Sequence, residues 1–250
     1  MAIGPDYGIR ACQVILPAPT FSPTGCYPYT NSIHMANIVI IGGSGFVGSA
    51  LVKEALSRGH QVKTVVRNPE KINIKDDRLE AVHGDIQNPG IVSDAVKGAE
   101  AVISAYNPGW SNPHIANETL SGYKSIIAGV KDAGVKRLLV VGGAGSLFIK
   151  PGVTVMDSGA IPEQMLPAVK ALAEVYHDLL PKEKELDWVF FSPAGNISPG
   201  ERTGKYRLGK NDLIVDDKGQ SKISVEDYAV AMIDELEKPQ HHRERFTIGY

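Results

Sequence analysis

Residues 37–48 read NIVIIGGSGFVG, an apolar run that passes directly into a glycine-rich turn. The run has the length and composition of a buried strand, and apolar residues recur at helical spacing after the turn. The glycines fit two patterns, Gly42-x-x-Gly45-x-x-Gly48 and Gly43-x-Gly45-x-x-Gly48. Both place glycine between a strand and a helix, where the backbone can approach a pyrophosphate without a Cβ in the way. We therefore expect a dinucleotide site formed by Gly42, Gly43, Ser44, Gly45, Phe46, Val47 and Gly48.

The rest of the chain alternates short apolar runs with longer amphipathic runs, as βαβ units do. Strands are expected at 37–42, 61–67, 79–85, 100–106, 137–143 and 187–193, with an edge strand at 245–250, and helices at 45–59, 89–97, 113–133, 162–180 and 223–239. In the last helix Ser224 is the expected N-cap, and Asp227 completes a weak form of the capping box. The pattern predicts an α/β fold, a single Rossmann-like doubly wound parallel sheet with helices on both faces.

The domain organisation is expected to be simple. Residues 35–250 form one NAD(P)-binding domain, in which 194–235 supply a small C-terminal region of substrate-side loops and a helix. Residues 1–34 are rich in proline and have no sustained period, so they are a disordered N-terminal extension, an expression-related segment or the result of a start codon assigned too early. A secretory signal is disfavoured because no basic stretch precedes an unbroken apolar run.

Composition narrows the function classes. The chain has 250 residues, 43% of them hydrophobic, and a formal net charge of -2, with both signs interspersed. No basic face recommends nucleic acid, and no polybasic or long apolar segment recommends a membrane. The only cysteines, Cys12 and Cys26, suggest neither a disulfide framework nor a metal site, which fits a reducing cytoplasm. The expected partners are a dinucleotide cofactor and a small-molecule substrate.

The end of the second expected strand bears on the choice of cofactor. Sites that prefer NAD usually present a carboxylate there, whereas this chain has Arg67 in VVRNP. A guanidinium can hold a 2′-phosphate and stack on adenine, which favours NADP, although NAD remains possible and Arg67 could also be a solvated strand end. After the third strand, Asp85 and Ile86 are placed to meet the adenine, but Asp85 could equally serve the turn.

Several motifs together resemble the atypical short-chain dehydrogenase/reductases, the group that includes NmrA-like proteins and NAD-dependent epimerase/dehydratase-like proteins. The resemblance covers residues 37–250 and rests on GGSGFVG, VVRNP, GDI, VISAYNPG, RLLVVGGAGS, FSPA and ISVEDYA. It implies that the loop 104–107 runs along the cofactor, including Ser104 and Ala105, and that 192–196 border the nicotinamide, including Pro193. Tyr106, Trp110 and Asn196 are then candidates for substrate contacts.

The same resemblance implies a Ser, Tyr and Lys set, with Tyr and Lys four residues apart on the helix after the fifth strand. In this chain the pair is Leu166 and Lys170, so the lysine is kept and the tyrosine is missing. The serine position falls on Gly143, and Ser146 either takes its place or only caps the turn. Tyr176 is expected to pack, and the Tyr-x-x-x-Lys in YRLGK, residues 206–210, is expected to be a coincidence.

Two classes of function follow. The first is an NADP-dependent oxidoreductase acting on a small quinone-, flavin- or carbonyl-like acceptor, with the nicotinamide carrying the chemistry. The second is a regulatory protein that senses NADP without turnover, and a nucleotide-sugar epimerase or dehydratase is a third possibility. His114, His241 and His242 lack the spacing to Cys or acidic residues that a metal site needs, so we assign no metal.

Overall fold

The computed structural model describes residues 35–250, so the expectations for residues 1–34, with Cys12 and Cys26, lie outside the part described. The central sheet has eight strands in the order β10-β12-β8-β5-β4-β1-β2-β3. In chain order these are β1 (Asn37–Ile41), β2 (Gln61–Val66), β3 (Leu79–His83), β4 (Ala101–Ser104), β5 (Arg137–Val141), β8 (Asp187–Ser192), β10 (Arg207–Gly209) and β12 (Glu244–Gly249). All neighbouring strands pair in parallel except β10, which pairs antiparallel with β12. The expected α/β fold with a doubly wound parallel sheet is therefore confirmed.

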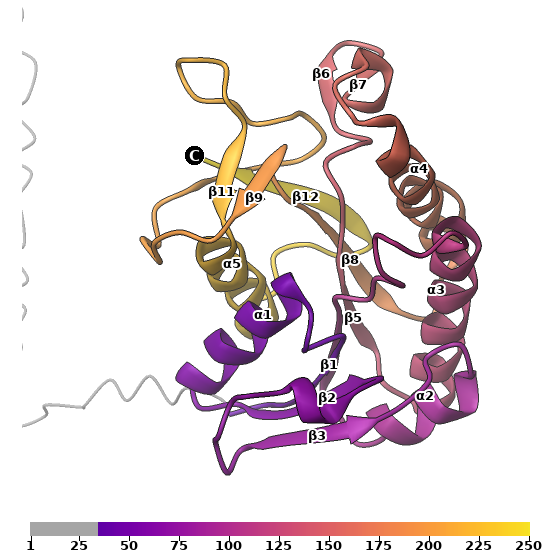
Figure 1. Cartoon of the computed structure of the whole chain (residues 1–250). Coiled ribbons are helices and arrows are strands. Elements are labelled where there is room, and N and C mark those ends of the chain that lie inside the picture. The colour runs from indigo at the N-terminus through magenta and orange to yellow at the C-terminus, as the bar shows by residue number, and fades with distance from the viewer. Residues whose placement is uncertain (1–34) are drawn as a thin grey trace, which may run out of the picture. The chain divides into compact units, whose positions relative to one another are not determined.

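Helices cover both faces of this sheet (Figure 1). They are α1 (Phe46–Ser57), α2 (Pro89–Val96), α3 (Ile115–Asp132), α4 (Leu166–Glu174) and α5 (Val225–Glu237). Successive strand residues point to opposite faces, so Ile38 and Ile40 pack with the α1 and α5 side, while Val39 and Ile41 pack with the α2, α3 and α4 side. Both faces are buried, which explains why the strands are apolar throughout rather than alternating.

The strand order reverses at β1. After β1 the chain builds outward through β2 and β3, and it then returns to place β4 on the other side of β1. In open parallel sheets, ligands bind outside the carboxyl ends of the strands at this kind of reversal. The turn that leaves β1, which carries the glycines, thus lies at the position where a dinucleotide site is expected.

The beginning of α5 follows the expected capping pattern only in part. Ser224 caps the helix, with its hydroxyl accepting from Asp227 N at 3.0 Å. The Asp227 carboxylate does not return to Ser224 N, as a capping box would require. It accepts instead from Thr203 Oγ1 at 2.6 Å, Gly204 N at 2.8 Å and Tyr250 Oη at 2.7 Å. Asp227 therefore ties the loop after residue 198 and the C-terminal residue to α5.

The C-terminal strand was expected at an edge, and this was wrong. β12 lies between β8 and β10, and Arg245 to Gly249 are all buried. The edge is β10, which pairs Arg207 with Gly249. The segment YRLGK supplies this strand, so Tyr206 and Lys210 are not a pair on a helix. The loop-rich region also contains β9 (Asn196–Ser198) and β11 (Lys222–Ser224), which pair in parallel.

The single helix expected at 162–180 is divided. A 3-10 turn at Glu163–Met165 precedes α4, a π-helical turn follows at Val175–Leu179, and a second 3-10 turn occupies Leu180–Lys182. Prolines lie near both ends of the segment. Pro167 lies in the first turn of α4 and Pro181 lies in the last 3-10 turn, and each removes a backbone donor. Between β5 and α4 a small hairpin, β6 (Phe148–Lys150) and β7 (Val153–Thr154), extends above α4 (Figure 1).

Candidate functional site

The glycine turn between β1 and α1 is held by close backbone contacts. Gly42 has a φ of 85°, and a Cβ on it would lie 2.7 Å from Ala105 O. A Cβ on Gly48 would lie 2.1 Å from Gly42 O, and Gly43 N donates to Thr64 Oγ1 at 3.2 Å. These glycines are therefore required by the packing of the turn against β2, β4 and its own helix.

Gly45 differs from its neighbours. It is the N-cap of α1 with φ -77° and no side-chain hydrogen bond, and the first turn of α1 contains no acidic residue. A Cβ on Gly45 would meet nothing closer than Gly42 O at 3.3 Å. Packing constrains Gly45 less than Gly42, Gly43 and Gly48, although 3.3 Å is a tight approach to a main-chain oxygen, and the N–H groups at the start of α1 have no side-chain cap. An open backbone at a helix N-terminus fits a pyrophosphate, with Ser44 and Phe46 exposed on either side.

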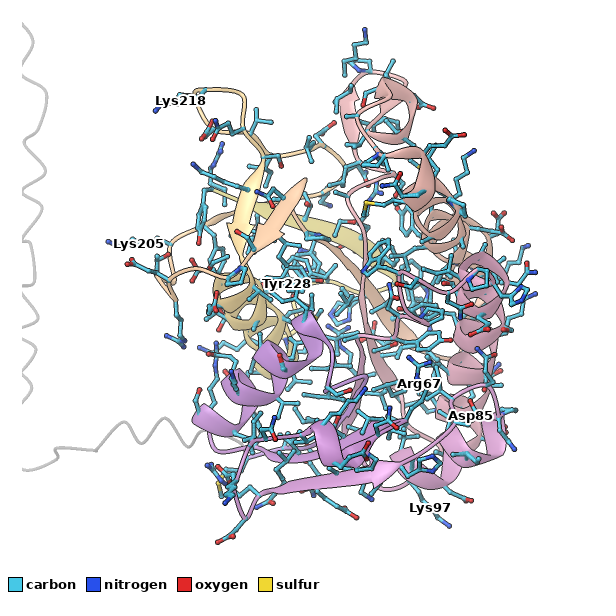
Figure 2. All side chains as sticks on the ribbon, viewed as in Figure 1. Arg67, Asp85, Lys97, Lys205, Lys218 and Tyr228 are labelled. Carbon is cyan, nitrogen blue, oxygen red and sulfur yellow. The ribbon has the colours of Figure 1, made fainter. Side chains whose placement is uncertain are left out.

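The loops after β2 and β3 carry the residues predicted to face the adenosine half of the cofactor. Figure 2 shows Arg67 and Asp85 beyond the ends of these strands, on the side of α2. Arg67 is exposed, and its Nη2 donates to Pro108 O at 3.3 Å. Asp85 Oδ1 accepts from Gln87 N at 3.0 Å, which is the turn contact considered for Asp85 as an alternative to adenine binding. Its other carboxylate oxygen makes no hydrogen bond within residues 35–250 that would compete with a ligand. Ile86 is buried beneath this turn.

The loop after β4 is fixed along the glycine turn. Ala105 N donates to Ile41 O at 2.9 Å, and Ser104 is fully buried. The Tyr106 hydroxyl donates to Glu118 O at 3.1 Å and accepts from Gln87 Nε2 at 2.9 Å. Burial raises the pKa of Tyr106 to about 12, which keeps this hydroxyl protonated and able to donate. Tyr106, predicted to contact substrate, thus holds the loop, whereas Trp110 in the same loop is 59% exposed.

The pair that the resemblance places at the catalytic centre lies at the start of α4. Leu166 is the first residue of this helix and is partly buried, and Lys170 is exposed one turn later. Within the part of the chain described, the Lys170 ammonium makes neither an ion pair nor a side-chain hydrogen bond, so it is available to a ligand. Leu166 offers no group that could donate or accept a proton.

Ser146, the other predicted catalytic residue, is engaged elsewhere. It is 3% exposed, and Arg245 Nη1 donates to its Oγ at 2.9 Å and to its carbonyl at 3.2 Å. Arg245 also donates to Asn211 Oδ1 at 2.9 Å. The Ser146 hydroxyl therefore holds Arg245, and it makes no side-chain hydrogen bond within its own turn among the described residues. Arg245 was not singled out from the sequence, where it appears only as a polar residue in an apolar strand.

The segment after β8 is the last part of the predicted site. Pro193 is buried directly after the strand, whereas Asn196, the first residue of β9, is exposed. Gly195 N donates to Ser221 Oγ at 2.9 Å, which joins this segment to the chain entering β11. Pro193 therefore lies at the carboxyl edge of the sheet together with the glycine turn and the loop after β4.

Two cavities lie away from these residues. One, of about 510 Å³, is lined by the first residues of β1, β2 and β3, with Asn37, Gln61 and Leu79 among them, at the opposite edge of the sheet. The other, of about 380 Å³, lies between α5, β10 and β12 and includes Tyr206, Leu208 and Phe246. Neither cavity contains a residue of the glycine turn or any other predicted site residue.

Comparison with known proteins decides the family. The model of the NAD(P)H-binding family matches residues 42–239. The chain belongs to the NAD(P)H-binding family. YwnB of Bacillus subtilis is 40% identical over 216 residues, covering 84% of this chain and 97% of that protein. A solved structure of a candidate epimerase from Bacteroides thetaiotaomicron has 61% identity and a TM-score of 0.82, covering 86% of this chain and 97% of that chain. One of a candidate NADH-flavin reductase from Streptococcus pneumoniae has 33% identity and a TM-score of 0.74, covering 86% and 99%.

Membership of the NAD(P)H-binding family agrees with the resemblance to atypical short-chain dehydrogenase/reductases, whose fold and dinucleotide site the chain shares. Among residues 35–250, no helix combines the length and apolar character that a membrane crossing requires. In the same range, no three or more His, Cys, Asp and Glu side chains are placed to hold a metal ion.

Proposed function

We propose that the protein is an NADP-dependent oxidoreductase that transfers hydride to a small quinone-, flavin- or carbonyl-like acceptor without a tyrosine acid or base. The observation that carries this proposal is the open turn at Gly45, where a Cβ would meet nothing closer than 3.3 Å although the neighbouring glycines are tightly enclosed. A glycine at the uncapped start of α1, with more space around it than Gly42, Gly43 and Gly48 have, suits the close approach of a pyrophosphate.

The preference for NADP rests on Arg67. Its guanidinium lies beyond the end of β2, where NAD-preferring sites present a carboxylate to the ribose hydroxyls. The neighbouring loop supplies the Pro108 carbonyl as one acceptor, which leaves the remaining N–H groups of Arg67 for a 2′-phosphate. Asp85, in the loop after β3, would serve the adenine amino group.

When bound, the nicotinamide supplies the hydride that reduces the acceptor. The residues of this chain would bind and orient the cofactor: the N–H groups at the start of α1 would hold the pyrophosphate, and Lys170 would meet the ribose on the nicotinamide side. Pro193 and Asn196 border the space for the acceptor, and Trp110 offers it an exposed ring. Because Leu166 cannot transfer a proton, acceptors whose reduced oxygen or nitrogen takes its proton from water are favoured, which describes quinones and flavins better than aldehydes.

The Streptococcus pneumoniae relative is named as a candidate NADH-flavin reductase, which supports a flavin-like acceptor for this chain. The Bacteroides thetaiotaomicron relative is named as a candidate epimerase, but an epimerase activity receives less support for this chain. Position 166 is a leucine, so no tyrosine is there to remove a hydroxyl proton.

The test mixes the protein with NADPH and a panel of quinones, free flavin and aldehydes, and follows the absorbance of the reduced nicotinamide. We expect saturable oxidation with a quinone or flavin and far slower oxidation with aldehydes. If NADPH binds saturably but is not oxidised with any acceptor of the panel or in cell extract, the proposed oxidoreductase activity is refuted.

That outcome would support a second candidate, a protein that senses NADP without turnover. One observation favours it: the Ser146 hydroxyl is occupied by Arg245 and Leu166 is inert, so neither position offers proton transfer. The two candidates share the cofactor site and differ only in whether NADPH is consumed.

A further inference from the structure

We propose that Gln87 is a positioning residue for the adenosine half of the cofactor. The proposal rests on the proposed function, because it assumes that the loops after β2, β3 and β4 form the adenosine site. Gln87 follows Asp85 and Ile86 directly in the sequence, and its side chain is bonded to residues of α3.

The Gln87 amide joins the loop after β3 to two other segments. Its Nε2 donates to Tyr106 Oη at 2.9 Å, in the loop after β4, and to Glu118 O at 3.0 Å, on α3. Its Oε1 accepts from Ser121 Oγ at 2.7 Å, also on α3. Because a main-chain carbonyl can only accept, the contact with Glu118 fixes which side of the amide carries the nitrogen. Every polar atom of the side chain therefore has a partner.

The Tyr106 end of this connection is rigid. The ring packs edge to face on the buried Tyr123, with 5.9 Å between ring centres. A Cβ on Gly122 would lie 2.4 Å from the Tyr106 ring, so α3 approaches this ring as closely as a glycine permits. Gln87 thus connects its own loop to a fixed point rather than to a flexible side chain.

The connected loops carry the adenosine contacts. The loop after β4 continues from Tyr106 to Pro108, whose carbonyl accepts from Arg67. The loop after β3 carries Asp85 and Ile86 immediately before Gln87. Releasing Gln87 would therefore loosen the loop after β3, the wall of the adenosine site that carries Asp85 and Ile86, and a ligand would have to order it on binding, which weakens affinity without removing a contact to the ligand.

The test measures binding of adenosine 2′,5′-bisphosphate by calorimetry, because this compound carries the 2′-phosphate and adenosine but no nicotinamide. We expect Gln87→Leu to raise its Kd about tenfold at a temperature where the variant is fully folded. Gln240→Leu is the matched control, since Gln240 Nε2 also donates to main-chain carbonyls, those of Lys238 and Pro239, at the far side of the sheet. The control should leave the Kd unchanged. An unchanged Kd in Gln87→Leu would overturn the proposal.

A double-mutant cycle separates positioning from a general loss of stability. Tyr106→Phe removes the hydroxyl that Gln87 holds, so its effect on the bisphosphate Kd should largely overlap with that of Gln87→Leu, giving a double variant less than additive. Additive effects would show that Gln87 and Tyr106 do not act through their shared hydrogen bond. A Kd change found only in variants that are already unfolding at the assay temperature would also contradict the proposal. Ser121→Ala, which removes the contact to Gln87 Oε1 and a longer one of 3.4 Å to Glu118 O, should raise the Kd about twofold and serves if Gln87→Leu fails to fold. If the unaltered protein does not bind the bisphosphate, the NADP assignment itself fails, an outcome distinct from an unaffected Gln87 variant.

Discussion

The guanidinium of Arg245 lies over the ring of Tyr176, 4.4 Å from the ring centre, and donates to Ser146 Oγ at 2.9 Å. Tyr176 in turn packs on Phe190 of β8, with 5.0 Å between ring centres. Burial lowers the pKa of Arg245, but an arginine stays charged, so its donors need acceptors. Ser146 supplies two of these acceptors from the turn after β5. The hydroxyl nearest to the expected serine position is thus used to hold a buried cation.

Ser146→Ala should therefore affect stability more than turnover. Removing a hydroxyl that accepts from a buried charged donor should lower the free energy of unfolding by about 1–2 kcal/mol, because the Ser146 carbonyl remains as a second acceptor. The NADPH oxidation rate should stay within about twofold, since each tenfold change in rate needs about 1.4 kcal/mol at the transition state. Urea unfolding and steady-state rates measure the two quantities. A large loss of rate at unchanged stability would instead make Ser146 catalytic.

Gly45→Ala should separate cofactor binding from folding. Gly45 has a φ that alanine adopts freely, but a Cβ there would lie 3.3 Å from Gly42 O and alanine is a poorer N-cap than glycine, so the free energy of unfolding should fall by about 1 kcal/mol while the variant stays folded. The methyl group would occupy the space assigned to the pyrophosphate and raise the Kd for NADPH by about tenfold or more. Gly48→Ala is the contrast: its Cβ would lie 2.1 Å from Gly42 O, so it should destabilise the fold by about 3 kcal/mol. Unchanged NADPH binding by folded Gly45→Ala would remove the main support for the site.

Arg67→Asp should change the cofactor preference. A 2′-phosphate loses its guanidinium partner and meets a like charge, so the Kd for NADPH should rise by about 100-fold. The Kd for NADH should change little or fall, because a carboxylate at this position can accept from the ribose hydroxyls. Titration of protein fluorescence with each cofactor gives the ratio. Equal losses for NADPH and NADH would refute the 2′-phosphate assignment.

Much of the fold could be predicted because buried parallel strands and amphipathic helices leave strong periodic signals. The same local reasoning placed β12 at an edge, since nothing in RFTIGY shows that the three residues Arg207–Gly209 will pair outside it. Short strands such as β9 and β10 depend on pairing with distant segments, and their own residues carry little preference. The divided helix around α4 depends on prolines and on packing of Tyr176, which periodicity does not register.

The candidate site likewise has a part that could be predicted from the sequence and a part that could not. The glycine turn was readable because its spacing follows from backbone geometry at a single strand-to-helix junction. The contacts of Ser146, Tyr106 and Gln87 could not be predicted from the sequence, since each contact joins residues that are distant in sequence. Ser146 bonds to Arg245 across 99 positions, and Gln87 bonds to Tyr106 and Ser121 across 19 and 34. A polar residue in an unremarkable sequence acquires its role only from such partners.

The loop after β9 should depend on pH through Glu54 of α1. Its carboxylate accepts from Arg202 of that loop at 2.7 and 2.8 Å and from Arg58 at 2.7 Å. Burial alone would raise the pKa of Glu54, but the hydrogen bonds from Arg202 and Arg58 outweigh it and hold the pKa below its usual 4.5. A carboxyl with a lowered folded-state pKa stabilises the protein above its unfolded pKa, and the contribution disappears as the pH falls through the folded pKa.

Glu54→Gln should therefore lower the free energy of unfolding by about 1–2 kcal/mol at neutral pH, a modest value because Arg202 is 54% exposed. The difference from the unaltered protein should shrink as the pH falls below 4.5 and vanish once Glu54 is protonated in the folded state. Urea unfolding across this pH range measures it, with Glu174→Gln on the exposed face of α4 as the matched control, expected to show little difference at any pH. A destabilisation by Glu54→Gln that stayed constant down to the lowest pH would show that the carboxylate charge is not what holds the loop to α1.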